Sequence, residues 1–186
     1  SSKQISHPII ELFGDTLSSK IIDKKMIQDT ALKFINYNQK DFYPLVDSLF
    51  KLLKYDCRLS RAGTNYQRWD AIIVDEFHSM PIEIKSPGEE RFISVKAVRQ
   101  ALENKIILLS RKEFPSQPET TSLVVGYEIP NNRSEVATLI EDIYTAFYLN
   151  IAVIDIKSLL YMVLQDKATN RIDLAYLRGI IDVYNS

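Results

Sequence analysis

Three residues near the middle of the chain have the types and spacing needed for metal-assisted chemistry. Asp70 is separated by twelve residues from the triplet Glu83-Ile84-Lys85. Mg²⁺ accepts carboxylate and main-chain carbonyl oxygens as ligands, and water and a substrate phosphate complete its shell. A lysine beside it can orient an attacking water and offset charge in a transition state. These parts suffice for phosphodiester hydrolysis. The candidate catalytic residues are Asp70, Glu83 and Lys85, and the candidate Mg²⁺ ligands are Asp70, Glu83 and the carbonyl of Ile84.

An acid-x-Lys triplet is a weak signal when it stands alone. The chain contains four of them: Asp23/Lys25, Glu83/Lys85, Glu103/Lys105 and Asp155/Lys157. Side chains at i and i+2 point to one face of a strand but diverge on a helix. The first and third triplets fall in segments with helical spacing. The fourth has an acid at the same offset, Asp142, but that residue lies in an expected helix, so the pattern favours Glu83/Lys85.

The connection between two β-rich segments sets the distance between the acids. Residues 68–74 and 80–85 are both typical of strands, and the residues between them are typical of a loop. A hairpin folded about this loop places Asp70 directly opposite Glu83, with Cβ atoms ~5 Å apart. Like charges opposed in this way destabilise a sheet, which favours a bound cation. A surface ion pair with Lys85 on an exposed sheet face is the alternative.

The surrounding segments predict the elements that hold this hairpin. Apolar residues at helical spacing predict helices at 8–17, 24–38, 41–55, 94–109, 134–149, 158–166 and 173–183. β-branched and apolar runs predict strands at 57–61, 68–74, 80–85, 121–129 and 151–156, with a turn at 62–65. The first three strands form an antiparallel meander. The fold class is therefore α/β, with a central mixed β-sheet flanked by helices.

Individual residues refine two of these helices. Asp41 is an expected N-cap, with Pro44 in the first turn that follows it. Ser94 is the expected N-cap of the helix after the hairpin. The apolar stripe of that helix is expected to comprise Val98, Ala101, Leu102, Ile106 and Leu109.

Composition excludes several kinds of protein. The chain has 186 residues, 46% of them hydrophobic and 25% charged, which predicts one globular domain over 1–186. Cys57 is the only cysteine and His7 and His78 are the only histidines, so disulfides, cysteine zinc clusters and histidine-metal nucleases are excluded. No apolar stretch approaches the ~20 residues of a membrane span, and the N-terminus lacks a secretory signal. We expect a cytoplasmic protein with no membrane partner.

The charge distribution bears on DNA binding. The net charge is -1, yet the segment 58–112 carries a small excess of basic residues while the remainder is acidic. The central third is therefore the candidate face for a polyanion. A free-standing sequence-specific DNA binder usually has a basic surplus. Its absence predicts catalysis in this chain and recognition in a partner.

The hairpin motif resembles that of the PD-(D/E)xK nuclease superfamily. The resemblance rests on Asp70 and Glu83-Ile84-Lys85, between a preceding helix and the helix at 94–109. It covers about residues 24–130, and Trp69 stands where the family has proline. It implies a restriction-endonuclease-like core of helix, three-stranded meander, helix and strand. Residues 134–186 would then form a C-terminal extension with extra helices.

Within the superfamily, length and pattern look most like the small subunit of a heterodimeric type IIS restriction endonuclease. That resemblance implies Mg²⁺-dependent cutting of one strand of double-stranded DNA by a bacterial enzyme. A larger subunit would read the sequence and cut the other strand. Many relatives carry a helical Glu before the meander, for which only Glu11 is available. Others use a Gln or Lys on the helix after the motif, where Lys96, Arg99, Gln100 and Glu103 share a polar face.

Two other functions remain open. The first is a homodimeric repair or junction-resolving nuclease on the same core, which would bind DNA tightly without a partner. The second is a non-enzymatic α/β interaction module in which Asp70, Glu83 and Lys85 form a structural ion pair. Mg²⁺ titration separates the second from both nucleases, because a satisfied salt bridge does not bind divalent cations.

Overall fold

The computed structural model describes residues 24–61, 67–130 and 134–169. The helices expected at 8–17 and 173–183 and the expected turn at 62–65 lie outside these ranges. So do Glu11 and His7. Within the described ranges, no helix is long and apolar enough to cross a lipid bilayer.

Five strands form one mixed sheet. They are β1 (Asp56–Leu59), β2 (Ala71–Val74), β3 (Met80–Ile84), β4 (Ser122–Gly126) and β5 (Ile151–Asp155). The strands lie side by side in chain order. The pairs β1·β2 and β2·β3 are antiparallel, whereas β3·β4 and β4·β5 are parallel. The expected α/β class, mixed sheet and antiparallel meander are thereby confirmed.

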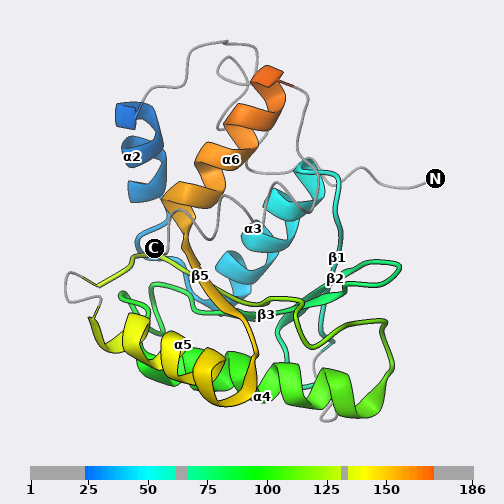
Figure 1. Cartoon of the computed structure of the whole chain (residues 1–186). Coiled ribbons are helices and arrows are strands. Elements are labelled where there is room, and N and C mark those ends of the chain that lie inside the picture. Colours follow the sequence, from blue (N-terminus) through cyan, green and yellow to red (C-terminus); the bar gives the residue numbers. More distant parts are fainter. Residues whose placement is uncertain (1–23, 62–66, 131–133, 170–186) are drawn as a thin grey trace.

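Helices cover both faces of the sheet (Figure 1). They are α2 (Lys24–Leu32), α3 (Gln39–Leu52), α4 (Val95–Arg111), α5 (Ser134–Phe147) and α6 (Ile156–Thr169). α3 and α6 pack on one face with α2 beside them, and α4 and α5 pack on the other. α4 and α5 are also the crossovers that parallel strands require.

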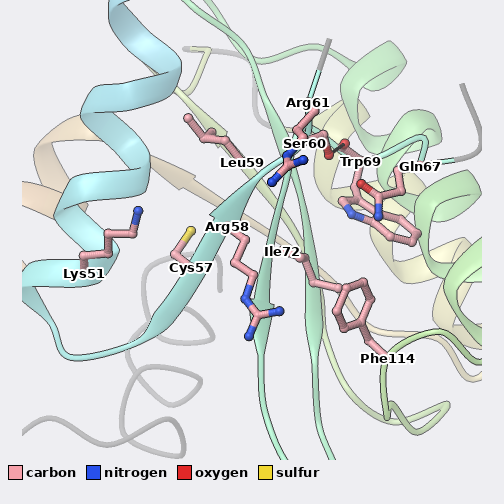
Figure 2. Close-up of a pocket in the computed structure, with 10 residues that line it drawn as sticks. All are labelled: Lys51, Cys57, Arg58, Leu59, Ser60, Arg61, Gln67, Trp69, Ile72 and Phe114. Atoms are coloured by element: carbon pink, nitrogen blue, oxygen red, sulfur yellow. Dashed lines mark hydrogen bonds between the residues drawn. The ribbon is translucent and has the colours of Figure 1, made fainter. Parts of the chain in front are cut away.

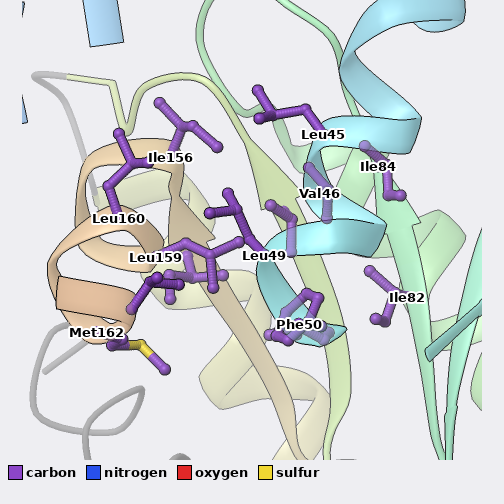
Figure 3. Close-up of a cluster of buried hydrophobic side chains, with 14 of the residues drawn as sticks. Leu45, Val46, Leu49, Phe50, Ile82, Ile84, Ile156, Leu159, Leu160 and Met162 are labelled. Atoms are coloured by element: carbon purple, nitrogen blue, oxygen red, sulfur yellow. The ribbon is translucent and has the colours of Figure 1, made fainter. Parts of the chain in front are cut away.

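Each face has its own hydrophobic core. On one face, Leu49 and Phe50 of α3 pack with Ile82 of β3 and Leu159 of α6 (Figure 3). On the other face, α4 and α5 pack against alternate residues of the same strands, such as Val124 of β4. A sheet buried on both sides requires apolar residues in both alternating positions, which explains the continuous apolar runs in the sequence.

Two helix boundaries differ from the expectation. α2 ends at Leu32, six residues before the end expected for the helix at 24–38. The chain then turns, and the rings of Phe34 and Tyr37 pack together with their centroids 5.1 Å apart. Tertiary packing overrides helical spacing there. The next helix has Asn38 as its N-cap in place of Asp41, so Pro44 lies beyond the first turn. Asn and Asp are equally good capping residues, and capping preference alone does not choose between them.

Candidate active site

The register of the β2–β3 hairpin brings the two acids together. Ala71 pairs with Ile82 and Ile73 pairs with Met80. Asp70 precedes Ala71 and Glu83 follows Ile82, so the two acids lie at the same end of this pairing. The register of β2 against β3 is the one expected from the hairpin.

Asp70 lies where β2 begins, and its main chain joins both neighbouring strands. Its carbonyl accepts a hydrogen bond from Ser60 N–H at 2.9 Å, and its own N–H donates to the carbonyl of Ile82 at 3.0 Å. The side chain turns back along β3, where Oδ2 accepts the N–H of Ile84 at 2.8 Å. The carboxyl group is therefore held by the strand that carries the other two candidate residues.

Glu83 lies on the face of β3 that α4 covers, and it is only 5% exposed. Its Oε2 accepts a hydrogen bond from Asn104 Nδ2 of α4 at 3.0 Å. Its Oε1 lies 3.4 Å from Lys85 Nζ. Asn104 is itself buried, so the carboxylate has one orientation defined from two sides.

Lys85 follows β3 directly and continues its ladder. Its N–H donates to the carbonyl of Val125 at 2.9 Å. The backbone therefore stays extended, and the side chains of Glu83 and Lys85 emerge on one face. Lys85 is 9% exposed. The pair is thus buried, unlike the exposed surface ion pair considered as the alternative.

The two carboxyl groups perturb each other. Burial and then the charge of Glu83 raise the pKa of Asp70 from its usual 3.8 to about 8, against the hydrogen bond from Ile84 and the charge of Lys85. Burial also raises the pKa of Glu83, although Asn104 and Lys85 act to lower it. The interaction with Glu83 acts to raise the pKa of Asp70, whereas the interaction with Asp70 acts to lower the pKa of Glu83. Two like charges this close ionise together only when a positive charge compensates them.

The donor set fits a hard divalent cation of the Mg²⁺ type. No cluster of three or more Asp, Glu, His or Cys side chains suited to a metal occurs in the described part of the chain. A site here would consist of Asp70, Glu83 and the carbonyl of Ile84. That carbonyl lies on the Asp70 side of β3, because the N–H and carbonyl of one strand residue point the same way. Mg²⁺ sites commonly have only one or two protein carboxylates.

A second group of polar residues lies between α3 and the loop after β3. Glu89 Oε1 accepts hydrogen bonds from Ser86 N–H at 3.1 Å and from Ser86 Oγ at 2.9 Å. Its Oε2 accepts from Gln39 Nε2 at 2.6 Å and from Tyr43 Oη at 3.4 Å. Burial acts to raise the pKa of Glu89, but these hydrogen bonds lower it below its usual value. Ser86 follows Lys85, so this group ties the candidate site to α3.

The polar face expected on α4 is divided between the site and solvent. Gln100 lies one turn before Asn104, and its Oε1 is buried without a hydrogen-bond partner among the described residues. Lys96 and Arg99 are exposed. Glu103 forms an ion pair of 3.5 Å with Arg68.

Three residues near the motif have structural roles. Trp69 is 2% exposed and packs edge-on against Phe114, with ring centroids 6.3 Å apart. Asp75 Oδ2 accepts the N–H groups of Phe77 and His78 in the hairpin loop. Asp75 and His78 both lie in the loop that the sequence predicts between these two strands.

A cavity of about 510 Å³ lies over β1 and the segment before β2 (Figure 2). Arg58, Gln67, Trp69 and Phe114 are among its lining residues. Asp70, Glu83 and Lys85 are not. The cavity therefore adjoins the candidate site through Trp69 but does not contain it.

Sequence reasoning missed Asn104, Tyr43 and Glu89. A signal existed for Asn104, because it falls on the buried face of a helix, where a polar side chain needs a partner. No local pattern marks Tyr43 or Glu89, which meet across 46 residues of chain. Comparisons with protein-family models, with curated proteins and with solved structures find no match for this chain.

Proposed function

We propose that this chain is a Mg²⁺-dependent DNA endonuclease that hydrolyses one strand of duplex DNA. It would be the catalytic small subunit of a heterodimeric type IIS restriction enzyme. The observation that carries the proposal is the pair of carboxyl groups of half-buried Asp70 and buried Glu83, with Lys85 beside Glu83. A fold has no structural need for such a pair, because opposed carboxylates cost stability.

The order of elements supports the same reading. The sequence α3, antiparallel β1–β2–β3, α4 and parallel β4 is the order of the restriction-endonuclease-like core, to which α5, β5 and α6 would be additions. The fit to this core covers helix, meander, helix and strand. It supports membership of the PD-(D/E)xK superfamily, which remains part of the proposal.

Each residue of the site has a distinct part in the proposed hydrolysis. Asp70, Glu83 and the Ile84 carbonyl would hold Mg²⁺, which when bound supplies Lewis-acid polarisation of the phosphate and a nucleophile at neutral pH. Lys85 offsets the negative charge that builds on the phosphate and orients the attacking water. Asn104 keeps Glu83 turned toward the site.

The single cleavage site and the low net charge both support a partner subunit. One pair of carboxylates cuts one strand, so a double-strand break needs a second site elsewhere. The net charge of -1 gives little general affinity for a polyanion. A larger subunit would therefore recognise the DNA and cut the second strand, in the cytoplasm of a bacterium.

Cleavage of supercoiled plasmid, in Mg²⁺ and in EDTA and with and without a candidate large subunit, tests the proposal. We expect Mg²⁺-dependent cutting by the wild-type chain that Asp70→Ala and Glu83→Ala each abolish. Asp56→Ala is the matched control, because Asp56 is an exposed acid of the same sheet. Full activity of either site variant would exclude this site. Failure of the wild type to bind Mg²⁺ in calorimetry would favour the non-enzymatic module.

A further inference from the structure

Tyr43 of α3 contacts Glu89, which is hydrogen-bonded to Ser86, the residue that follows Lys85. The side chain of Tyr43 is partly buried, and its hydroxyl donates to Glu89 Oε2. The negative charges of Asp70, Glu89 and Glu83 all act on this hydroxyl. The phenol therefore contacts Glu89 and is affected by the charges of Asp70 and Glu83.

The surroundings of Tyr43 determine which form of the phenol exists. Burial, then the charges of Asp70 and Glu89, raise the pKa of Tyr43 above its usual value of 10.0. These effects favour the neutral phenol over the phenolate. It remains a neutral hydrogen-bond donor among anionic groups.

Glu89 does not depend on Tyr43 for its position. Three shorter hydrogen bonds, two from Ser86 and one of 2.6 Å from Gln39, already hold its two oxygens. The contact from Tyr43 is 3.4 Å long, near the limit at which hydrogen bonds retain strength. The hydroxyl can therefore turn to another acceptor at little cost.

We propose that Tyr43 donates a hydrogen bond to a non-bridging phosphate oxygen of the DNA strand bound at Asp70 and Glu83. The inference rests on the proposed nuclease function and adds a substrate-contacting residue to it. A phosphodiester that approaches two carboxylates and Glu89 meets like charge. A neutral O–H among them binds an anionic oxygen strongly, because hydrogen bonds to charged groups are stronger than neutral ones.

Tyr43→Phe tests this assignment, because it removes only the hydroxyl. We expect the rate of plasmid nicking in Mg²⁺ to fall roughly 10- to 100-fold, the loss typical of a hydrogen bond to a charged group. Binding of a short duplex in Ca²⁺, measured by fluorescence anisotropy, should weaken as well. Mg²⁺ affinity in calorimetry and the melting temperature should stay at the wild-type values.

Two controls distinguish substrate contact from support of the loop. Tyr161→Phe makes the same change in a partly buried tyrosine of α6 and should leave nicking unchanged. Gln39→Leu removes the shortest hydrogen bond to Glu89 and should affect nicking less than Tyr43→Phe does. Equal activity and duplex affinity of Tyr43→Phe and wild type would overturn the assignment. A larger loss in Gln39→Leu would also overturn it, because Tyr43 would then act only through Glu89. A wild-type chain that neither binds Mg²⁺ nor nicks DNA would instead overturn the nuclease function itself.

Discussion

At the residue scale, Asp70 and Glu83 differ in how completely they are held. Glu83 has a buried amide on one oxygen and an ammonium near the other. Asp70 has the Ile84 N–H on Oδ2, and burial and the charge of Glu83 raise its pKa. The fold therefore disfavours the ionised form of Asp70, and a bound cation would compensate its charge.

Asp70→Asn should change the dependence of stability on pH. The pKa of Asp70 is raised to about 8 in the folded chain, so the folded state favours the protonated form. The stabilisation of the folded state by protonated Asp70 is complete below the pKa of 3.8 that this group has in the unfolded chain. It is lost as pH rises toward about 8. Asparagine resembles the protonated acid and does not ionise. In EDTA, the melting temperature of the variant relative to wild type should therefore be higher near pH 8 than near pH 5. A difference that does not grow with pH would contradict the assigned direction.

Asn104 and Gln100 should respond in opposite ways to replacement by leucine. Asn104→Leu leaves Glu83 Oε2 buried without a donor, which costs about 1–3 kcal/mol of unfolding free energy. It should also weaken Mg²⁺ binding, because the orientation of the carboxylate is lost. Gln100→Leu removes an oxygen that has no partner among the described residues and should leave stability equal or higher. Urea denaturation and calorimetry measure both effects, and similar losses in the two variants would contradict this account.

At the element scale, the hairpin and most of the buried face of α4 were predictable, whereas the burial of polar residues on α4 was not. The position of the loop sets the register of β2 against β3, which brings Asp70 and Glu83 to the same end of the hairpin, since a strand ladder advances by whole residues. On α4, Asn104 and Lys105 are buried while Ile106, expected in the apolar stripe, is 51% exposed. Lys105 Nζ donates hydrogen bonds to Ser116 Oγ and to the carbonyl of Gln117. Those acceptors lie on the loop after α4, and the spacing of apolar residues in the sequence does not show that this loop contacts Lys105. The burial of Lys105 could therefore not be derived from the apolar residues alone.

Gly126→Ala should destabilise the contact between β4 and the segment before α4. A Cβ at this position would overlap the Cγ1 and Cδ1 atoms of Ile93. Overpacking of this kind typically costs about 1–3 kcal/mol. Ile93→Ala removes both atoms, so the double variant should lose less stability than the sum of the single variants. Urea denaturation of the four proteins gives the coupling, and strict additivity would contradict direct contact.

At the scale of the whole molecule, one site and little net charge limit what the isolated chain can do. We expect it to convert supercoiled plasmid to open circles and not to linear DNA, because one site cuts one strand. Its affinity for duplex DNA at about 0.1 M salt should be weak, since nonspecific attraction is largely screened there. Gel analysis and fluorescence anisotropy measure the two quantities. Linear product from the isolated chain, or tight binding, would favour a homodimeric nuclease.

The central position of β3 has a consequence for how the proposed nuclease would be activated. β3 is the third of five strands and is buried along its whole length. Main-chain amides in such a strand exchange with solvent deuterium only when the domain unfolds globally. The geometry at Glu83 and Ile84 would then last as long as the native state itself. Any activating subunit would act by delivering DNA to a preformed centre, and deuterium uptake at β3 should stay the same when that subunit binds.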